Sequence, residues 1–298
     1  MKRTVILIPF ILAAVLSFAL GTGEGGDFEY DGIREIEIAA GTFTVDVQGT
    51  RGRTTSLEVR NESSNFEVLH ARSGDRLEIW VERKFSLLNR PHRGELVLLV
   101  PGDTELQIRT STGEIDVRNI TSERLSVDST TGRITLEEIS ASMHVETSTG
   151  TVEVLDSAGR FDITSTTGTI ELRRATGDVA AESSAGSHSY EDVIGDLVVR
   201  STTGRIEIAG MQGTLDLRTS TGGQDGRGIV LTGDSSFESS TGRIKMDFAG
   251  SVEQFEFDLR STTGSLRVGR EESQRQLYLG GTGFTIRGKS STGSQEYF

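Results

Sequence analysis

A short motif, Ser-Thr-Gly or Ser-Thr-Thr-Gly, recurs along most of the chain and limits its possible folds more than any other feature. Copies end at Gly113, Gly132, Gly150, Gly168, Gly204, Gly222, Gly242, Gly264 and Gly293, with a degenerate Ser-Ala-Gly copy ending at Gly186. From Gly132 to Gly222 every interval is 18 residues, and the later intervals of 20, 22 and 29 residues are expected to carry extra loops. A repeat of fixed length indicates one small structural unit that is stacked many times.

Each repeat contains two predicted strands. Apolar residues occupy the second and fourth positions after the motif glycine, as Ile206 and Ile208 do after Gly204. A second alternating pair, such as Leu197 and Val199, often follows another glycine placed nine residues after the motif glycine. Alternation with period two predicts strands that bury one face. Each half of the repeat is therefore expected to be a short strand and a tight turn.

A unit of this size cannot bury a core of its own, so neighbouring units must share one. We therefore predict an all-β fold, a parallel β-solenoid in the form of a single-stranded, right-handed β-helix with 18 residues per coil. The hydrophobic content of 34% and the 36 glycines suit a thin solenoid with a narrow apolar seam. A sandwich or barrel of antiparallel hairpins is the alternative, because the sequence does not determine strand direction. A left-handed hexapeptide helix would place apolar residues at a different spacing.

The repeats divide the chain into three predicted parts. Lys2 and Arg3 precede an apolar run from Val5 to Leu20, which predicts a Sec-type signal peptide over residues 1–21. An uncleaved N-terminal anchor is the alternative, because the run approaches the length that crosses a bilayer. Residues 22–108 are rich in alternating patterns but irregular, which predicts a cap of strands and hairpins. Residues 109–298 form the repeat region, and the mature chain is expected to lie in the periplasm, on the cell surface or outside the cell, with no membrane span.

Charge and cysteine content exclude several classes of partner and cross-link. The formal net charge is −13, which repels nucleic acid and anionic lipid. The chain has no cysteine, so it forms no disulfide and lacks the thiol to which bacterial lipoproteins attach lipid. Packing and backbone hydrogen bonds must provide all of its stability.

One divergent repeat holds the residue types of a serine hydrolase, namely Ser184, His188, Glu191 and Asp192. A catalytic triad depends on geometry, and proximity along the chain says little about it. His188 follows Gly186 by two residues, a position that isoleucine or valine fills in other repeats. We therefore expect His188 to face the core or its rim, and we predict no catalytic residue.

Carboxylate pairs and a glycine-rich stretch raise two further possibilities. Glu137 with Glu138, and Glu191 with Asp192, could support polysaccharide cleavage, but most turns are too short to wall a cleft. The longer intervals 222–242 and 264–293 are where such a cleft is expected if it exists. Residues 222–226 resemble the calcium-binding nonapeptide β-roll, but only once, so we predict no metal and no cofactor.

The pattern Ser-Thr-Thr-Gly-x-Ile-x-Ile, here Ser201 to Ile208, follows an irregular β segment that ends in Leu99-Val100-Pro101. This arrangement resembles the bacterial "putative adhesin" family of β-strand-repeat proteins over nearly the whole mature chain. The resemblance implies a parallel β-helix and an envelope or secreted location, and it offers no catalytic residues to carry over. Likeness of fold does not by itself establish function.

These observations favour a non-catalytic surface protein that acts as an adhesin, a binding module or a structural module. Its flat β faces are expected to meet a polysaccharide or another envelope protein. The alternative is a polysaccharide-cleaving enzyme, a lyase or glycoside hydrolase, on the same parallel β-helix.

Overall fold

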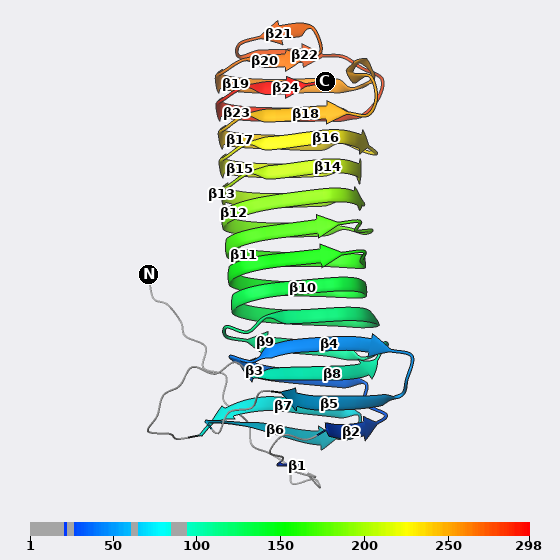
Figure 1. The fold of residues 1–298 in the computed structure, drawn as a ribbon. Coiled ribbons are helices and arrows are strands. Elements are labelled where there is room, and N and C mark those ends of the chain that lie inside the picture. The colour runs from blue at the N-terminus through cyan, green and yellow to red at the C-terminus, as the bar shows by residue number, and fades with distance from the viewer. Residues whose placement is uncertain (1–20, 23–26, 61–64, 85–93) are drawn as a thin grey trace.

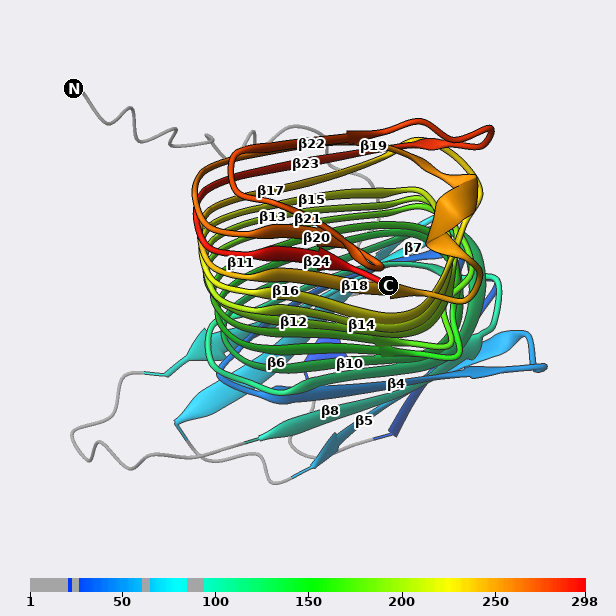
Figure 2. The same cartoon turned by 90° about the horizontal axis from the view of Figure 1, so that it is seen from above.

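The computed structural model describes residues 21–22, 27–60, 65–84 and 94–298. Apart from Gly21, the predicted signal peptide lies outside the described residues. The strands stack as rungs of a single rod, and the view along the rod shows the coils as a flattened ring (Figures 1 and 2). The described chain is all-β except for one short 3-10 helix, η1 (Val252–Gln254).

The N-terminal part of the rod contains nine strands among the described residues. They are β1 (Gly21–Thr22), β2 (Asp27–Asp31), β3 (Glu35–Gly41), β4 (Thr44–Thr50), β5 (Thr54–Arg60), β6 (Phe66–Ser73), β7 (Arg76–Arg83), β8 (Glu95–Pro101) and β9 (Glu105–Thr110).

The repeat region supplies the remaining strands. They are β10 (Ile115–Leu155), β11 (Ala158–Arg173), β12 (Val179–Ile194), β13 (Leu197–Thr203), β14 (Ile206–Gly213), β15 (Leu215–Thr221), β16 (Gln224–Leu231), β17 (Ser235–Thr241) and β18 (Ile244–Phe248). The C-terminal end adds β19 (Glu256–Thr263), β20 (Leu266–Val268), β21 (Glu271–Ser273), β22 (Gln276–Leu279), β23 (Thr285–Thr292) and β24 (Gln295–Tyr297).

Every pairing between consecutive coils from β9 to β18 is parallel. One face carries β13, β15 and β17 side by side, and the other carries β14, β16 and β18. Leu197 pairs with Leu215, and Ile206 pairs with Gln224, so partners there lie 18 positions apart in the chain. The body of the rod is thus a parallel β stack, and the antiparallel alternative does not describe it.

The apolar seam forms the core between the two faces. In β13, the side chains of Leu197, Val199 and Ser201 are buried while Arg200 and Thr202 are exposed. The same alternation buries Ile206 and Ile208 in β14. Each coil adds a few apolar side chains to a column that its neighbours continue, which is how short units acquire a shared interior.

The motif glycines form a column in which successive backbones nearly touch. Gly204 has φ +152°, and a Cβ atom there would lie 1.6 Å from the carbonyl oxygen of Gly186. Both the conformation and the lack of space exclude a side chain. The repeated glycine therefore reflects close packing of one coil on the next.

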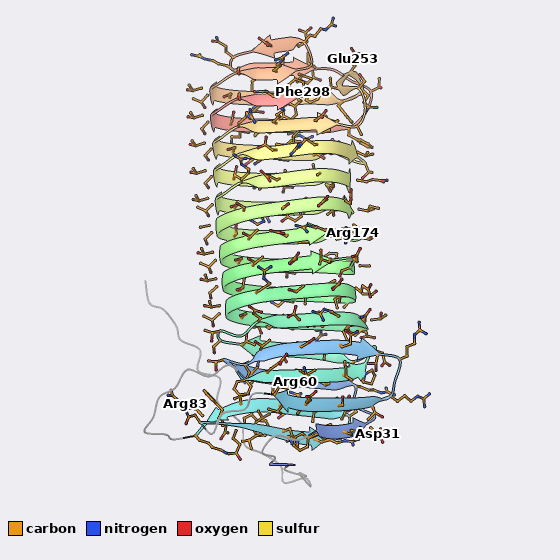
Figure 3. All side chains as sticks on the ribbon, viewed as in Figure 1. Asp31, Arg60, Arg83, Arg174, Glu253 and Phe298 are labelled. Atoms are coloured by element: carbon orange, nitrogen blue, oxygen red, sulfur yellow. The ribbon has the colours of Figure 1, made fainter. Side chains whose placement is uncertain are left out.

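A second column of unusual backbone runs along the edge where the other turn lies. At this turn the left-handed conformation is adopted in successive coils by Asn119, Glu138, Asp156, Arg174, Asp192, Gly210 and Gly228. Arg174 marks this edge in Figure 3. Its guanidinium holds the Asp156 carboxylate of the preceding coil through contacts of 2.6 and 2.7 Å.

Antiparallel strands close both ends of the rod. At the N-terminal end β5 pairs with β2 and β8, and β6 pairs with β7, all antiparallel. At the C-terminal end β22 pairs antiparallel with β19, and β21 with β20. These hairpins cover the open edges that a parallel stack would otherwise expose to other chains.

The order of coils at both ends of the rod differs from the order of their residues along the chain. β3 and β4, within the region predicted as an irregular cap, lie between β7/β8 on one side and β9/β10 on the other. β23 and β24 lie between β17/β18 and β19/β20. A segment near each end of the described chain is thus paired along both edges, which opposes fraying.

Candidate binding groove along the rod

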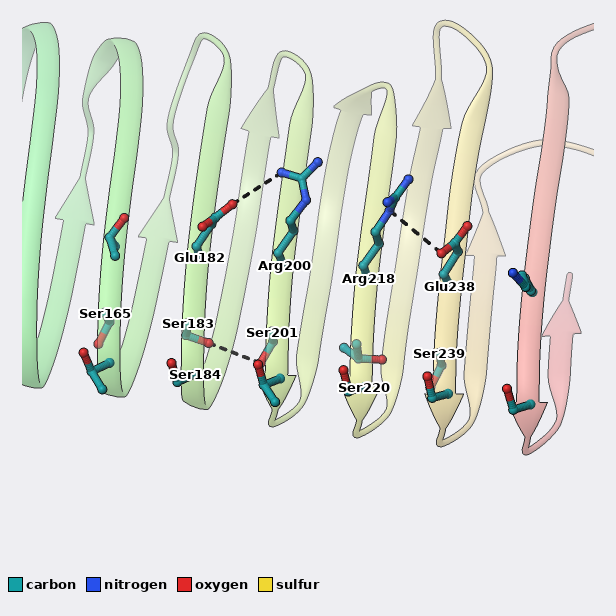
Figure 4. Close-up of a pocket in the computed structure, with 17 residues that line it drawn as sticks. Ser165, Glu182, Ser183, Ser184, Arg200, Ser201, Arg218, Ser220, Glu238 and Ser239 are labelled. Atoms are coloured by element: carbon teal, nitrogen blue, oxygen red, sulfur yellow. Dashed lines mark hydrogen bonds and ion pairs between the residues drawn. The ribbon is translucent and has the colours of Figure 1, made fainter. Parts of the chain in front are cut away.

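A groove of about 560 Å³ runs across successive coils on the face formed by β11, β12, β13, β15, β17 and β23 (Figure 4). Its walls consist almost entirely of polar and charged side chains. They are Thr164, Ser165, Thr166, Glu182, Ser183, Ser184, Arg200, Ser201, Thr202, Arg218, Thr219, Ser220, Glu238, Ser239, Ser240, Lys289 and Ser291.

Charged residues form one wall because parallel pairing stacks equivalent positions. Glu182 pairs with Arg200, Arg200 with Arg218, Arg218 with Glu238, and Glu238 with Lys289. These five residues, named here the charged column, all precede the Ser/Thr of a motif copy. The repeat therefore converts a sequence position into a continuous line on the surface.

The motif hydroxyls form the rest of the groove in two columns. Ser183, Ser201 and Ser239 are buried, whereas Ser184 and Thr202 are exposed. Neighbouring coils are spaced by about 4.8 Å, so the exposed hydroxyls repeat at that interval. The buried column is also hydrogen-bonded in places, since the Oγ of Ser183 lies 3.1 Å from that of Ser201.

The groove continues toward the N-terminal end as a second hollow of about 330 Å³. Its lining residues are Arg109, Thr110, Asp128, Ser129, Thr130, Glu146, Thr147, Ser148, Thr164 and Thr166. Thr164 and Thr166 belong to both hollows. The two hollows thus form one path along most of the rod.

The charged column is only weakly neutralised by its neighbours. Arg200 lies 3.5 Å from Glu182, and Arg218 lies 3.4 Å from Asp216. About half of each arginine side chain is exposed, and exposed ion pairs of this kind contribute little to stability. Lys289 has no ion pair within the described ranges. These side chains can therefore reorient toward a partner at little cost.

The four residues of hydrolase type that lie close in sequence do not come together in the structure. Ser184 lines the groove and faces outward, whereas His188 is buried inside the rod with 1% of its surface exposed. Glu191 and Asp192 are exposed near the C-terminal end of β12, where Asp192 adopts the left-handed conformation. This arrangement agrees with the expectation that His188 occupies a core position.

His188 instead belongs to a buried polar network. Its Nε2 atom lies 2.6 Å from the Oγ of Ser183, and its Nδ1 lies 3.1 Å from the Tyr190 hydroxyl. Burial lowers the pKa of His188 to about 4 and raises that of Tyr190. No substrate can reach this histidine without opening the coil, so the network is structural.

The remaining candidates are also distributed over the surface. Glu137 lies 3.6 Å from Arg118, and Glu138 is an exposed turn residue. Asp225, from the glycine-rich stretch, is in β16 and lies 3.3 Å from Arg243. Within the described ranges no group of three or more acidic, histidine or cysteine side chains could hold a metal ion. No helix in the described part of the chain is long and apolar enough to cross a membrane.

The groove residues were not singled out by the sequence patterns discussed above. The signal was present, because the residue before the motif Ser/Thr is charged in most repeats, for example Glu182, Arg200 and Arg218. Its meaning depends on strand direction and register, since only parallel pairing in register aligns these positions.

Comparison with solved structures found a crystal structure from Clostridium sporogenes described as a putative cell adhesion protein. The two chains share 6% identity, and the match covers 92% of this chain and 99% of that one with a TM-score of 0.21. At this TM-score the likeness supports no inference about fold or function. A search of curated proteins gave no match.

The family comparison is decisive where the structural one is not. The model of the Toastrack DUF4097 family matches residues 33–283, which include the strands from β3 to β22. Since the match covers most of the described rod, the chain belongs to the Toastrack DUF4097 family.

Proposed function

We propose that this protein is a non-catalytic binding module of the bacterial cell envelope, which holds an extended partner along the groove. The observation that carries the proposal is the groove itself, a continuous polar path that crosses successive coils. The membership of the Toastrack family is compatible with it. The proposal includes export by cleavage of residues 1–21, a right-handed coil, and a division into a cap over residues 22–108 and a repeat region over 109–298.

The groove suits a linear polysaccharide best among extended partners. Carboxylates, guanidinium groups and hydroxyls, all present on its walls, hydrogen-bond readily to sugar hydroxyls. Both walls repeat at the spacing of the coils, so a polymer with its own repeat could form similar contacts along its length. A β stack also holds these groups on a rigid support, which reduces the entropy lost on binding.

A glycan array probed with the folded chain tests this function. The double variant Arg200→Ala/Arg218→Ala removes two charged groups from the groove and is expected to weaken binding at least about tenfold, as the loss of two such contacts would. Arg205→Ala/Arg243→Ala is the matched control, because it removes the same charge from exposed residues outside the groove lining. Equal binding by both double variants, or no binding of the parent chain to any glycan, would contradict the proposal.

The second candidate is polysaccharide cleavage, since the two carboxylates Glu182 and Glu238 line the same groove. They are separated by three pairing steps, through Arg200 and Arg218. At about 4.8 Å a step their backbones lie roughly 14 Å apart. Paired acid and base carboxylates in glycoside hydrolases lie within roughly 10 Å of each other. Sugar release that is abolished by Glu182→Gln would nevertheless establish the enzyme and refute the binding function.

A further inference from the structure

The last described segment, residues 285–298, fills a position between two coils that precede it in the chain. β23 pairs in parallel with β17 on one edge and with β19 on the other. β24 does the same with β18 and β20. Figure 1 shows this segment in red and dark orange between the yellow-orange and orange coils. We call the space between these two coils the C-terminal slot.

The column of motif glycines confirms this order independently of the strand pairings. A Cβ atom on Gly293 would lie 2.0 Å from the carbonyl oxygen of Gly242, and one on Gly264 would lie 2.1 Å from that of Gly293. The backbone of Gly293 is therefore packed between the other two. The segment is a full coil of the rod and not a tail laid on its surface.

The segment is held by its core side chains as well as by its backbone. Tyr297 is fully buried, and its ring centroid lies 5.9 Å from that of Phe237 and 5.5 Å from that of Phe257. Gly288 provides the space for this ring, because a Cβ there would lie 2.5 Å from the Tyr297 hydroxyl. The bulky residue and the gap that receives it thus belong to the same segment.

The slot consists entirely of residues that precede the segment in the chain. Until residues 285–298 enter, β17 and β19 each present an unpaired strand edge toward the slot, together with the side chains of Phe237 and Phe257. Unpaired edges of this kind accept strands from other chains. A second copy of the same segment would make every contact that the chain's own segment makes.

The connection to the segment allows such an exchange. Residues 280–284 join β22 to β23 without strand structure and contain Gly280, Gly281 and Gly283. Two chains can exchange identical elements when the hinge can lead the segment either back to its own chain or across to a second one. The segment makes the same contacts in both cases. The equilibrium between a monomer that binds its own segment and an exchanged dimer depends on two concentrations. These are the concentration of the second copy and the effective concentration of the segment tethered to the same chain.

We propose that the C-terminal slot is a strand-acceptor site for residues 285–298 of a second copy, so that two chains exchange these segments and form a dimer. The exchange is favoured wherever copies are crowded together. The segment supplies Lys289 and Ser291 to the groove, and a segment from a second copy would supply the same two residues. The exchange therefore does not depend on what the groove binds.

Cysteine cross-linking tests the exchange directly, because the natural chain has no cysteine. Thr241 and Thr292 are pairing partners across the slot, and both side chains are exposed. A full-length copy with Thr241→Cys is mixed at high concentration with one carrying Thr292→Cys, then oxidised or treated with a short bismaleimide. Exchange predicts a covalent dimer that contains one copy of each variant. At low concentration, where the segment stays in its own slot, a single chain with both substitutions should instead cross-link internally and remain a monomer.

The matched control is the pair Thr149→Cys and Thr167→Cys, divided between two copies in the same way. These residues are pairing partners at the equivalent motif position in the middle of the rod, where no segment can exchange. We expect at least about tenfold more covalent dimer from the slot pair than from this control, given the effective concentration that an occupied slot creates. Equal yields from the two pairs would overturn the proposal. Light scattering on the parent chain should also detect a dimer whose fraction rises with protein concentration.

Discussion

The Nε2 atom of His188 lies 2.6 Å from the Oγ of Ser183 in the interior of the rod, where both side chains are buried. The register neighbours of His188 in the adjacent coils are Ile170 and Ile206. A polar residue therefore occupies an apolar column here without being left unpaired. The hydroxyl that satisfies it is the buried serine of the motif, five residues earlier in the chain.

The same relationship recurs wherever this core position is polar. The Nε2 of Gln224 donates to the Thr219 hydroxyl at 3.2 Å, and that of Gln295 donates to Ser290 at 2.9 Å. In each case one partner is the buried Ser/Thr of the motif, five residues before. The two glutamines also donate to backbone carbonyls, Gln224 to that of Glu238 at 2.7 Å and Gln295 to that of Arg260 at 2.8 Å. Because burying a polar group is costly unless it is hydrogen-bonded, the motif hydroxyl helps this core position to accept polar residues.

The buried histidine predicts an acid-sensitive contribution to stability. Above pH 6.5 it is neutral in the folded and the unfolded chain and contributes no pH dependence. Between pH 6.5 and about 4 the unfolded chain takes up a proton that the folded chain excludes, so the free energy of unfolding falls as pH is lowered. The fall attributable to this residue is up to about 3 kcal/mol. Denaturant unfolding at several pH values measures it.

His188→Gln isolates this contribution, because Gln224 and Gln295 show that glutamine fits the equivalent position. The variant should keep most of the free energy of unfolding near neutral pH. Below pH 6.5 its free energy of unfolding should fall less steeply than that of the parent, because the part due to His188 is absent. A variant that remains as acid-sensitive as the parent would show that His188 is protonated in the folded rod or that other groups dominate.

Gly204→Ala is expected to destabilise the rod severely. The new Cβ would lie 1.6 Å from the backbone of Gly186, and the residue would have to keep a φ of +152°. Backbone atoms cannot move aside without separating two coils, so we expect a loss of about 3 kcal/mol or more, or failure to fold. Thermal unfolding followed by circular dichroism checks this. Gly280→Ala is the control, since nothing lies within 4 Å of its Cβ position, and it should unfold close to the parent temperature.

Glu138→Gly is expected to stabilise the protein. Glu138 is an exposed residue with φ +56°, a conformation that costs a residue with a side chain about 1–2 kcal/mol. Glycine removes this conformational cost, but its greater freedom in the unfolded chain offsets part of the effect. The free energy of unfolding should therefore rise by about 0.5–1 kcal/mol. The free energy of denaturant unfolding measures it.

The reverse substitution at an equivalent turn provides the comparison. Gly228 has φ +64° and no atom closer than 3.7 Å to its Cβ position, so Gly228→Ala tests the conformation without a clash. It should lower the free energy of unfolding by about 1 kcal/mol. If both substitutions changed stability in the same direction, backbone strain would not explain this column.

Calcium is expected to leave the melting temperature unchanged. The stretch that resembles a calcium loop runs into β16, where Asp225 lies 3.3 Å from Arg243. Within the described part of the chain no three candidate ligands converge. Thermal unfolding with millimolar calcium and with a chelator tests this, and a large stabilisation by calcium would reveal a site that the described geometry does not contain.

Much of the body could be predicted because the physical signals are local and repeated. Ile206 and Ile208 mark a buried face by their alternation, and Gly204 marks a turn. The position of His188 followed from the same register, because the repeat places it in an isoleucine column. A periodic sequence supplies the same evidence many times, so one irregular copy does not obscure it.

The groove and the order of coils at the ends of the rod could not be predicted in this way. Arg200 and Arg218 become neighbours only when strands run in parallel and in register, and the repeat is also compatible with hairpins. The placement of residues 285–298 between two earlier coils leaves no local trace, since Gln295 and Tyr297 alternate as any other strand would.

The sequence by itself determined the unit, with its two strands, its motif glycine and the core position that His188 occupies, because these depend on contacts within a few residues. The tertiary structure decided the order in which units stack, the antiparallel closure of both ends and the line of charges on one face. Those features depend on which strand edges are left unpaired once the other coils have formed. That competition between edges is a property of the assembled rod.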